Sequence, residues 1–375
     1  MANILFITTV YRTGEKIFPI IPELCKNHTV DVLNIGQMSN KTGWGGDIDV
    51  RQNFYKMCDD LNITSIHAPK FMENKDEMAV EYNKFFEGIE DILKKNYYHI
   101  AIMDNNVTQK GLGLSNLYKW LNSQNIPVIG SPHGNKEFKG QRVLKKIGNL
   151  FDYSFVFGEK EKNKIVKYEG KYKQHFNRLI PSGIPSNDIL KNYKRNNKYI
   201  LIISNYTVNV NCMGDKFFGF TKDIFYKMGI LNLSQKLGVP IVIKEKVRLL
   251  YNDDSLSNAL LGLKDVSFIR DCEDDNRLIS DAKYVISSSS TMAFKPIQAG
   301  IPTVLLRGYG MTGNFYDYPG LINDSEKEMN DSLSFQNNNG IFCDFIKNTL
   351  EGGIDYTSTS IHVDYINRII NREIL

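Results

Sequence analysis

The stretch YVISSSSTMAFKPIQAGIPTVLLR, from Tyr284 to Arg307, indicates the fold of the chain. An apolar strand (Tyr284 to Ile286) leads through a hydroxyl-rich turn into a short helix (Met292 to Ala299), and a second apolar strand follows (Thr303 to Leu306). This order is typical of an α/β unit with a parallel sheet. Backbone N–H groups and hydroxyls at such a turn can donate to phosphate oxygens. We therefore expect a site for the phosphates of an activated donor, formed by Ser287, Ser288, Ser289, Ser290 and Thr291.

The chain is long enough for two α/β domains, and its composition is that of a folded protein. The 375 residues are 42% hydrophobic and 11% aromatic, which is sufficient for two packed cores. The formal net charge of +4 comes without long Lys/Arg blocks, so a dedicated nucleic-acid binder is not favoured. The five cysteines stand singly, without a CxxC pair, and suggest neither a zinc site nor a disulfide framework. We expect no metal and no cofactor.

The cellular location is predicted from apolar runs and charge. No apolar run reaches the roughly 20 residues that span a bilayer, and the first strand, Ile4 to Val10, is too short for a signal peptide. We expect a cytoplasmic protein. The lysine-rich segment from Lys160 to Lys173 is either a solvated helix face or a surface for an acidic acceptor or lipid headgroups. In the second case the protein would bind peripherally at the inner face of a membrane.

The first half of the chain has the pattern of a parallel sheet covered by helices. Short apolar runs alternate with helical or loop-like segments, and they cover residues 4–10, 29–34, 63–67, 99–104 and 126–129. In an open α/β sheet, functional groups lie in the loops after the carboxyl ends of the strands. The loops after these runs therefore contain the candidate residues of the first domain.

The loops after the first and fourth runs each offer a polar candidate. Arg12 and Gly14 follow the first run, where they could bind an anion and let it approach closely, or form an ordinary turn into a helix. Asp104 ends the fourth run. It is interpreted as a carboxylate for binding or catalysis, with a helix cap as the alternative.

The loop after the second run, Gly43 to Asp49, is too rich in glycine to be predicted as helix. Trp44 could stack on a sugar ring, while Asp47 or Asp49 could accept hydrogen bonds from sugar hydroxyls. A surface loop without a ligand is the alternative.

The fifth run ends in SPHG, Ser131 to Gly134, which presents a histidine at the edge of the predicted sheet. Pro132 fixes the chain before this histidine and Gly134 relaxes the chain after it. A neutral imidazole in this place can take a proton from an attacking hydroxyl. We therefore expect His133 to act in catalysis or substrate binding, with a structural hydrogen bond as the alternative. The other five histidines show no metal-ligand spacing and are interpreted as structural or surface residues.

The strand and helix pattern starts again at Tyr199, which predicts a second doubly wound domain. Lys244 lies at a strand end, where it could neutralise a diphosphate or belong to a charged loop. Arg307, followed by glycines, comes after the last strand and could close over a donor. The chain has no GxxxxGK[ST] motif and no GxGxxG after its first strand. Neither a P-loop enzyme nor a nicotinamide cofactor is therefore favoured.

Three segments in a fixed order resemble a known pattern: PHG at 132–134, SGIPSNDIL at 182–190 and SDAKYVISSSSTMAFKPIQAGIPTVLL at 280–306. They resemble the two-domain GT-B fold of nucleotide-sugar glycosyltransferases, and within it the group of CDP-glycerol glycerophosphotransferases and capsule polymer transferases. The resemblance implies a base at His133, a donor-phosphate loop at Ser287 to Thr291, and a last helix that crosses back to the first domain. The implied organisation is an acceptor-side domain over 1–190, a donor domain over 191–355 and a returning helix over 356–375.

Departures from the group's pattern concern the donor. Lys244-Glu245-Lys246 stands where the group has Lys-x-His, and the serine loop lacks an Asp. These departures favour a glycosyltransferase in the wider sense over an enzyme that uses a glycerol-phosphate donor.

The expected function is metal-independent transfer of a sugar from a nucleotide-sugar to an acceptor hydroxyl, as in polysaccharide biosynthesis, with His133 as base. The acceptor could be a glycan, a lipid-linked glycan, a small molecule or a modified nucleic-acid base. One alternative is a CDP-glycerol-type glycerophosphotransferase. Another is a non-hydrolysing nucleotide-sugar 2-epimerase, which needs several carboxylates, whereas the segment after His133 offers Glu137 alone. A non-catalytic nucleotide-sugar-binding module is the third.

Overall fold

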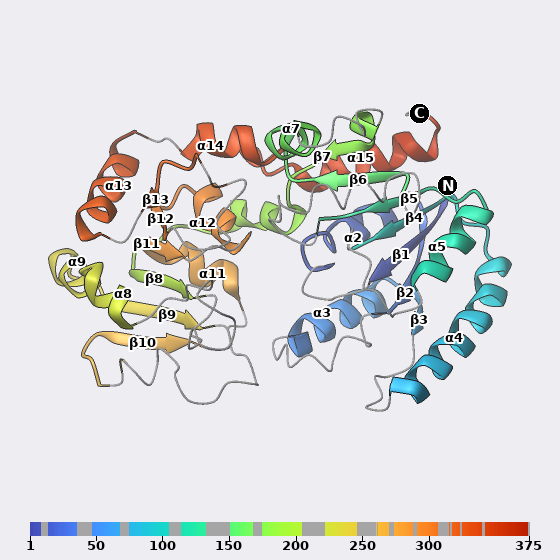
Figure 1. The fold of residues 1–375 in the computed structure, drawn as a ribbon, viewed down its shortest axis with the longest axis horizontal. Helices are drawn as coiled ribbons and strands as arrows, with labels where there is room; N and C mark the ends of the chain where they lie inside the picture. Colours follow the sequence, from blue (N-terminus) through green and yellow to red (C-terminus); the bar gives the residue numbers. More distant parts are fainter. Residues whose placement is uncertain are drawn as a thin grey trace. The chain divides into compact units, whose positions relative to one another are not determined.

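The structure is a computed structural model, and Figure 1 shows its ribbon. Its two compact units are unit 1, Met1–Asp188 with Asn348–Leu375, and unit 2, Ile189–Lys347. Each unit contains a parallel β-sheet with apolar cores on both faces, so the predicted pair of doubly wound domains is confirmed. The residues that the structure describes are 1–8, 14–35, 47–67, 75–104, 114–132, 151–167, 175–204, 222–245, 260, 262–269, 274–287, 291–306, 315, 317–322, 325–339 and 342–373.

The described strands of unit 1 form a seven-stranded sheet in the order β3-β2-β1-β4-β5-β6-β7. The chain adds strands outward from β1 to β3 and then returns to place β4 on the other side of β1. The loops after β1 and β4 therefore diverge, and this switch point is where open α/β sheets bind ligands. The strands are β1 (Asn3–Thr8), β2 (Thr29–Asn34), β3 (Thr64–His67), β4 (Ile100–Met103), β5 (Val128–Gly130), β6 (Tyr153–Val156) and β7 (Leu179–Pro181).

Alternate side chains of β1 belong to different cores because successive residues of a strand point to opposite faces. Ile4 and Phe6 pack in one core with α2 (Ile20–Cys25), α3 (Asp47–Asp60) and the late helix α15 (Ser358–Ile370). Leu5 and Ile7 pack in the other with α4 (Lys75–Lys95) and α5 (Leu114–Ser123). Burial on both faces explains why the strand reads as a continuous apolar run. After β6 the chain forms α7 (Glu159–Lys167).

Unit 2 has a six-stranded sheet among its described residues, in the order β10-β9-β8-β11-β12-β13. Its switch point lies between β8 and β11, because the chain moves outward to β10 before β11 returns beside β8. The strands are β8 (Tyr199–Ser204), β9 (Ile241–Glu245), β10 (Val266–Ile269), β11 (Ala282–Ser287), β12 (Thr303–Leu306) and β13 (Leu321–Ile322). The helices are η4 (Pro185–Asn192), which crosses from unit 1, α8 (Lys222–Lys227), α9 (Ile230–Leu237), α11 (Asp275–Ser280), η6 (Thr291–Ala293), α12 (Phe294–Gln298), α13 (Glu326–Asn339) and α14 (Phe342–Thr349), which crosses back.

The described part of the stretch from Tyr284 to Arg307 forms the predicted strand, helix and strand, as β11, η6 with α12, and β12, while the predicted turn at 288–290 lies outside the described residues. Gly300 ends the helical part with φ +67°, a left-handed conformation that glycine adopts without strain. The start of β12 is held by Gln336 of α13. Its side-chain amide accepts from the N–H and donates to the C=O of Thr303, both at 2.7 Å.

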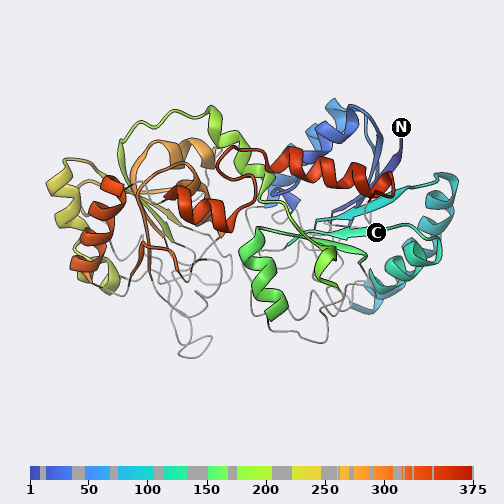
Figure 2. The ribbon, with the colours of Figure 1, turned by 90° about the horizontal axis from the view of Figure 1, so that it is seen from above.

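The last helix was predicted to cross back to the first domain. The helix α15 packs in unit 1 in this way (Figure 2). Ile366 and Ile369 are buried in the same core as Ile4 of β1. The Asp188 carboxylate accepts from the N–H groups of Ser358 and Thr359, at 3.2 and 2.6 Å, where α15 begins. A carboxylate at a helix start satisfies unpaired N–H groups and interacts favourably with the helix dipole.

One predicted boundary is wrong, for a local reason. Asp47 and Asp49 are helical residues at the start of α3 and do not lie in a loop. Acidic residues are favourable in the first turn of a helix. In unit 2, Gly229, which has φ +61°, separates α8 from α9. Among the described residues, no helix is long and apolar enough to cross a membrane.

Candidate functional site

The switch point of unit 1 holds a buried carboxylate. Asp104 directly follows β4 and is fully buried, and its Oδ2 accepts a 2.7 Å hydrogen bond from the hydroxyl of Thr8, the last residue of β1. Gly14 lies against it, because a Cβ at that position would be 2.8 Å from the same Oδ2 and 2.3 Å from the Phe18 ring. Two of the predicted site residues, Asp104 and Gly14, are therefore neighbours.

A buried phenol lies beside this carboxylate. Tyr118 of α5 donates a hydrogen bond to the sulfur of Met103, the residue before Asp104. Burial raises the pKa of Tyr118 well above its usual value, and the charge of Asp104 raises it further. Both effects favour the neutral phenol.

A second polar group lies further along the same sheet edge, at the carboxyl ends of β2 and β3. The side-chain amide of Asn34 is 3.2 Å from Nδ1 of His67 and donates to the Tyr55 hydroxyl at 3.2 Å. The rings of Tyr55 and His67 meet edge to face, with centroids 5.5 Å apart. Partial desolvation lowers the pKa of His67, while the charge of Asp59 opposes the shift. Sequence reasoning grouped His67 with the structural histidines, although its place at a strand end was a signal for a site position.

The switch point of unit 2 carries the first residue of the predicted phosphate loop. Ser287 is the last residue of β11 and is fully buried. In the register of the parallel strands, Ser287 pairs with Ile203 of β8, and Ile203 pairs with Lys244 of β9. Thr291, the last residue of the predicted phosphate loop, begins η6. Ser287 and Lys244 therefore belong to one row of residues near the carboxyl edge of the sheet.

Lys244 is paired with a carboxylate of α11. Its Nζ forms a hydrogen-bonded ion pair with Asp275, and the two side chains are 16% and 27% exposed. Lys295 of α12 donates to the side-chain oxygen of Asn276 at 2.9 Å. The first turn of α11 thus contacts two lysines that come from different elements of unit 2.

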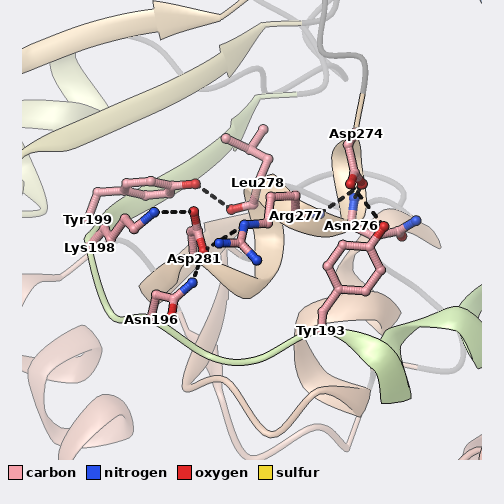
Figure 3. A network of polar contacts seen from close by, with 9 residues as sticks. All are labelled: Tyr193, Asn196, Lys198, Tyr199, Asp274, Asn276, Arg277, Leu278 and Asp281. Carbon is pink, nitrogen blue, oxygen red and sulfur yellow. Dashed lines mark hydrogen bonds and ion pairs between the residues drawn. The ribbon is translucent and has the colours of Figure 1, made fainter.

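The helix α11 is tied to the chain that enters unit 2 (Figure 3). At its start, Asp274 accepts from two backbone N–H groups of the first turn and from the Tyr193 hydroxyl at 2.9 Å. At its end, Asp281 accepts from Lys198 at 2.8 Å and from Asn196, and pairs with Arg277. Burial alone would raise the pKa of Asp281, but these hydrogen bonds and charges lower it below its usual value.

The remaining predicted site residues stay predictions. Only the backbone of Asp47 and Asp49 is described. The residues that lie outside the described ranges are Arg12, Trp44, His133, Ser288, Ser289, Ser290 and Arg307. Within the described ranges, no group of three or more His, Cys, Asp or Glu side chains could hold a metal ion.

Comparison with known proteins identifies the fold. No protein-family model and no curated protein sequence matches the chain. Among solved structures, UDP-GlcNAc 2-epimerase from Neisseria meningitidis bound to UDP-GlcNAc is similar, with a TM-score of 0.60 at 16% identity over 98% of this chain and 100% of that one. The UDP-GlcNAc 2-epimerase from Methanocaldococcus jannaschii gives a TM-score of 0.65 at 13% identity, over 97% and 99%. A glycosyltransferase from Rickettsia africae gives 0.58 at 12% identity, over 98% of each chain.

The chain therefore has the GT-B-like fold of two Rossmann-like domains that these structures share. The fold predicted from the three motifs is confirmed. None of these three structures is a CDP-glycerol transferase, so the narrower resemblance to that group gains no support from them.

Proposed function

We propose that the protein acts on a nucleotide-sugar and that its reaction is epimerisation at C2 of the sugar, without hydrolysis of the nucleotide. The observation that carries this proposal is the fold match over nearly the whole of both chains to UDP-GlcNAc 2-epimerases, one of them bound to UDP-GlcNAc. Since fold alone does not determine function, the residues at the two switch points must also suit the reaction.

Epimerisation at C2 makes two chemical demands. The C2 hydrogen of a pyranose is not next to a carbonyl and is therefore not acidic. It can leave as a proton if its electrons form a C1=C2 bond while the C1–O bond breaks and the nucleoside diphosphate departs. Adding the diphosphate back at C1 and a proton to the opposite face of C2 gives the epimer. The protein must supply groups that move the proton and cations or N–H donors for the departing diphosphate.

Residues of both units can be assigned to these demands. Asp104 is the predicted site residue with a described carboxylate at the switch point of unit 1. We assign it to the chemistry at the sugar. Its hydrogen bond from Thr8 and its contact with Gly14 fix its orientation. In unit 2, we assign diphosphate binding to Lys244 and to the turn that begins at Ser287. His133 stays a candidate for the second proton-transfer group.

Incubation with UDP-GlcNAc in D2O, without acceptor and followed by proton NMR, tests the proposal. An epimerase should produce a second UDP-N-acetylhexosamine and replace the C2 hydrogen by deuterium, because the proton exchanges with solvent while it is held by the protein. Intact UDP-GlcNAc with no deuterium at C2 after prolonged incubation at high protein concentration would exclude this reaction for that substrate.

Glycosyl transfer is the second candidate, and the fold match to the Rickettsia africae glycosyltransferase favours it. In this case His133 would deprotonate the acceptor hydroxyl and unit 2 would bind the same diphosphate. The same incubation separates the two, because a transferase without acceptor should release UDP slowly and leave C2 protonated. Binding without any turnover would instead support a non-catalytic nucleotide-sugar-binding module.

A further inference from the structure

The ion pair between Lys244 and Asp275 joins the carboxyl end of β9 to the first residue of α11. Both side chains are largely shielded from water, with 16% and 27% of their surface exposed. A shielded ion pair is screened less than one in open solvent. Lys295, which lies in α12 after the predicted phosphate loop, donates instead to the neutral amide of Asn276. Among the described residues, the two lysines therefore differ, since Lys244 pairs with a carboxylate and Lys295 bonds to an amide.

Asp275 is held in this place by the anchoring of its helix. The residue before it, Asp274, caps α11 and accepts from the Tyr193 hydroxyl. At the other end, Asp281 is bound by Lys198, Asn196 and Arg277, as Figure 3 shows. The Tyr199 hydroxyl also donates to the carbonyl of Leu278 at 2.7 Å. A helix fixed at both ends holds the Asp275 carboxylate beside Lys244 in this structure.

We propose that Asp275 is an intramolecular counter-ion of Lys244 that competes with the diphosphate of the nucleotide for the same ammonium group. The inference rests on the proposed function, because it takes the Lys244 ammonium as a diphosphate-binding group. A carboxylate and a phosphate both prefer the charged donors of Lys. Asp275 thus keeps Lys244 ordered and neutralised in the empty protein, and it lowers the affinity for nucleoside diphosphate so that the product can leave.

This arrangement also discriminates by charge. An incoming group must attract Lys244 more strongly than a single carboxylate does, which a diphosphate with two or more charges can do and an uncharged nucleoside cannot. Asp275 is therefore a specificity-determining and positioning residue, and it acts on the ligand through Lys244.

The test measures UDP binding by isothermal titration calorimetry in the full-length protein. We expect Asp275→Asn, which keeps the side-chain shape and an acceptor oxygen, to bind UDP about tenfold more tightly, since the competing charge is removed. Lys244→Gln should bind UDP about tenfold more weakly. In the Lys244→Gln background, Asp275→Asn should change UDP affinity by less than about twofold, because the effect passes through Lys244. Asp275→Ser, which also suits a first helical turn, should reproduce the gain if the first variant folds poorly.

Asp331→Asn is the matched control. It changes the net charge by the same amount at an exposed position of α13, where Asp331 pairs with Lys327. UDP affinity of this variant should equal that of the unmodified protein, and uridine affinity should be the same in every variant.

The outcomes separate the two proposals. If the unmodified protein binds UDP but the two Asp275 variants bind it equally or more weakly, the counter-ion inference is overturned while the proposed function stands. If neither the unmodified protein nor the Asp275 variants bind UDP, the proposed action on a UDP-sugar and the counter-ion inference are overturned together. An equal gain in Asp331→Asn would show a general charge effect and would also overturn the role of Asp275.

Discussion

Acidification should weaken unit 1 through His362, a fully buried imidazole of α15. Its Nδ1 lies 2.8 Å from the Ser358 carbonyl and its Nε2 lies 3.1 Å from the Ser182 hydroxyl, so the neutral ring donates to the first and accepts from the second. The ring also packs on Phe155, with centroids 4.2 Å apart. Burial lowers the pKa of His362 to about 4, although the hydrogen bond to Ser358 opposes the shift.

The sign and size of the effect follow from linkage. The folded pKa is below the unfolded value of about 6.5, so between these two values the unfolded chain binds the extra proton. The stability contributed by the neutral His362 is complete above about pH 6.5 and is lost as the pH falls toward 4. From pH 7 to pH 5 the loss amounts to about 2 kcal/mol.

Tryptophan fluorescence during urea unfolding can measure this loss in unit 1 alone. The two tryptophans, Trp44 and Trp120, belong to unit 1, and unit 2 has none. The comparison is between the unmodified protein and His362→Gln, which cannot titrate. The carboxylates and the other histidines titrate in both proteins and cancel. The stability advantage of the unmodified protein should shrink by about 2 kcal/mol between pH 7 and pH 5, and an advantage that is equal at both pH values would refute the reasoning.

Three further changes have defined consequences. Gly14→Ala should destabilise unit 1 by about 1–3 kcal/mol in the same fluorescence assay, because its Cβ would lie 2.3 Å from the Phe18 ring; full stability would show that the turn adjusts freely. Asp104→Asn should slow conversion of UDP-GlcNAc at least about 100-fold by NMR while UDP affinity changes less than about twofold, and undiminished turnover would remove this carboxylate from the reaction. Gln336→Leu should destabilise unit 2 by about 1–3 kcal/mol in calorimetry, since the N–H of Thr303 loses its buried partner; a loss below about 0.5 kcal/mol would contradict this.

The sheets could be predicted from the sequence because their strands are buried on both faces. Such strands read as short apolar runs, and those of β1, β4, β8 and β11 were all visible in this way. The helix α13 was not predicted, because its sequence EKEMNDSLSFQNNN is mostly polar and buries few side chains, among them Met329 and Leu333. One of its polar residues, Gln336, is buried for a hydrogen bond to a strand distant in sequence, and no local pattern indicates such a contact.

The positions of candidate site residues in the fold could be predicted from the sequence, but the residues that they contact could not. The rule that functional groups follow strand ends selected Asp104, Ser287 and Lys244, and all three lie near the carboxyl edges of their sheets. The contacts of Asp104 with Thr8 and of Lys244 with Asp275 join residues far apart in the chain. They depend on which strands and helices become neighbours, and this is decided by the whole fold.

The discontinuity of unit 1 has a consequence for synthesis of the protein on the ribosome. The core that contains Ile4 is completed by Ile366 and Ile369 of α15, which are translated only after all of unit 2. Unit 2 is continuous, so it can fold as soon as it has emerged, whereas unit 1 must wait with part of its apolar surface uncovered. During this interval the nascent chain would be a natural client for chaperones that bind exposed apolar segments, and the docking of α15 would release it.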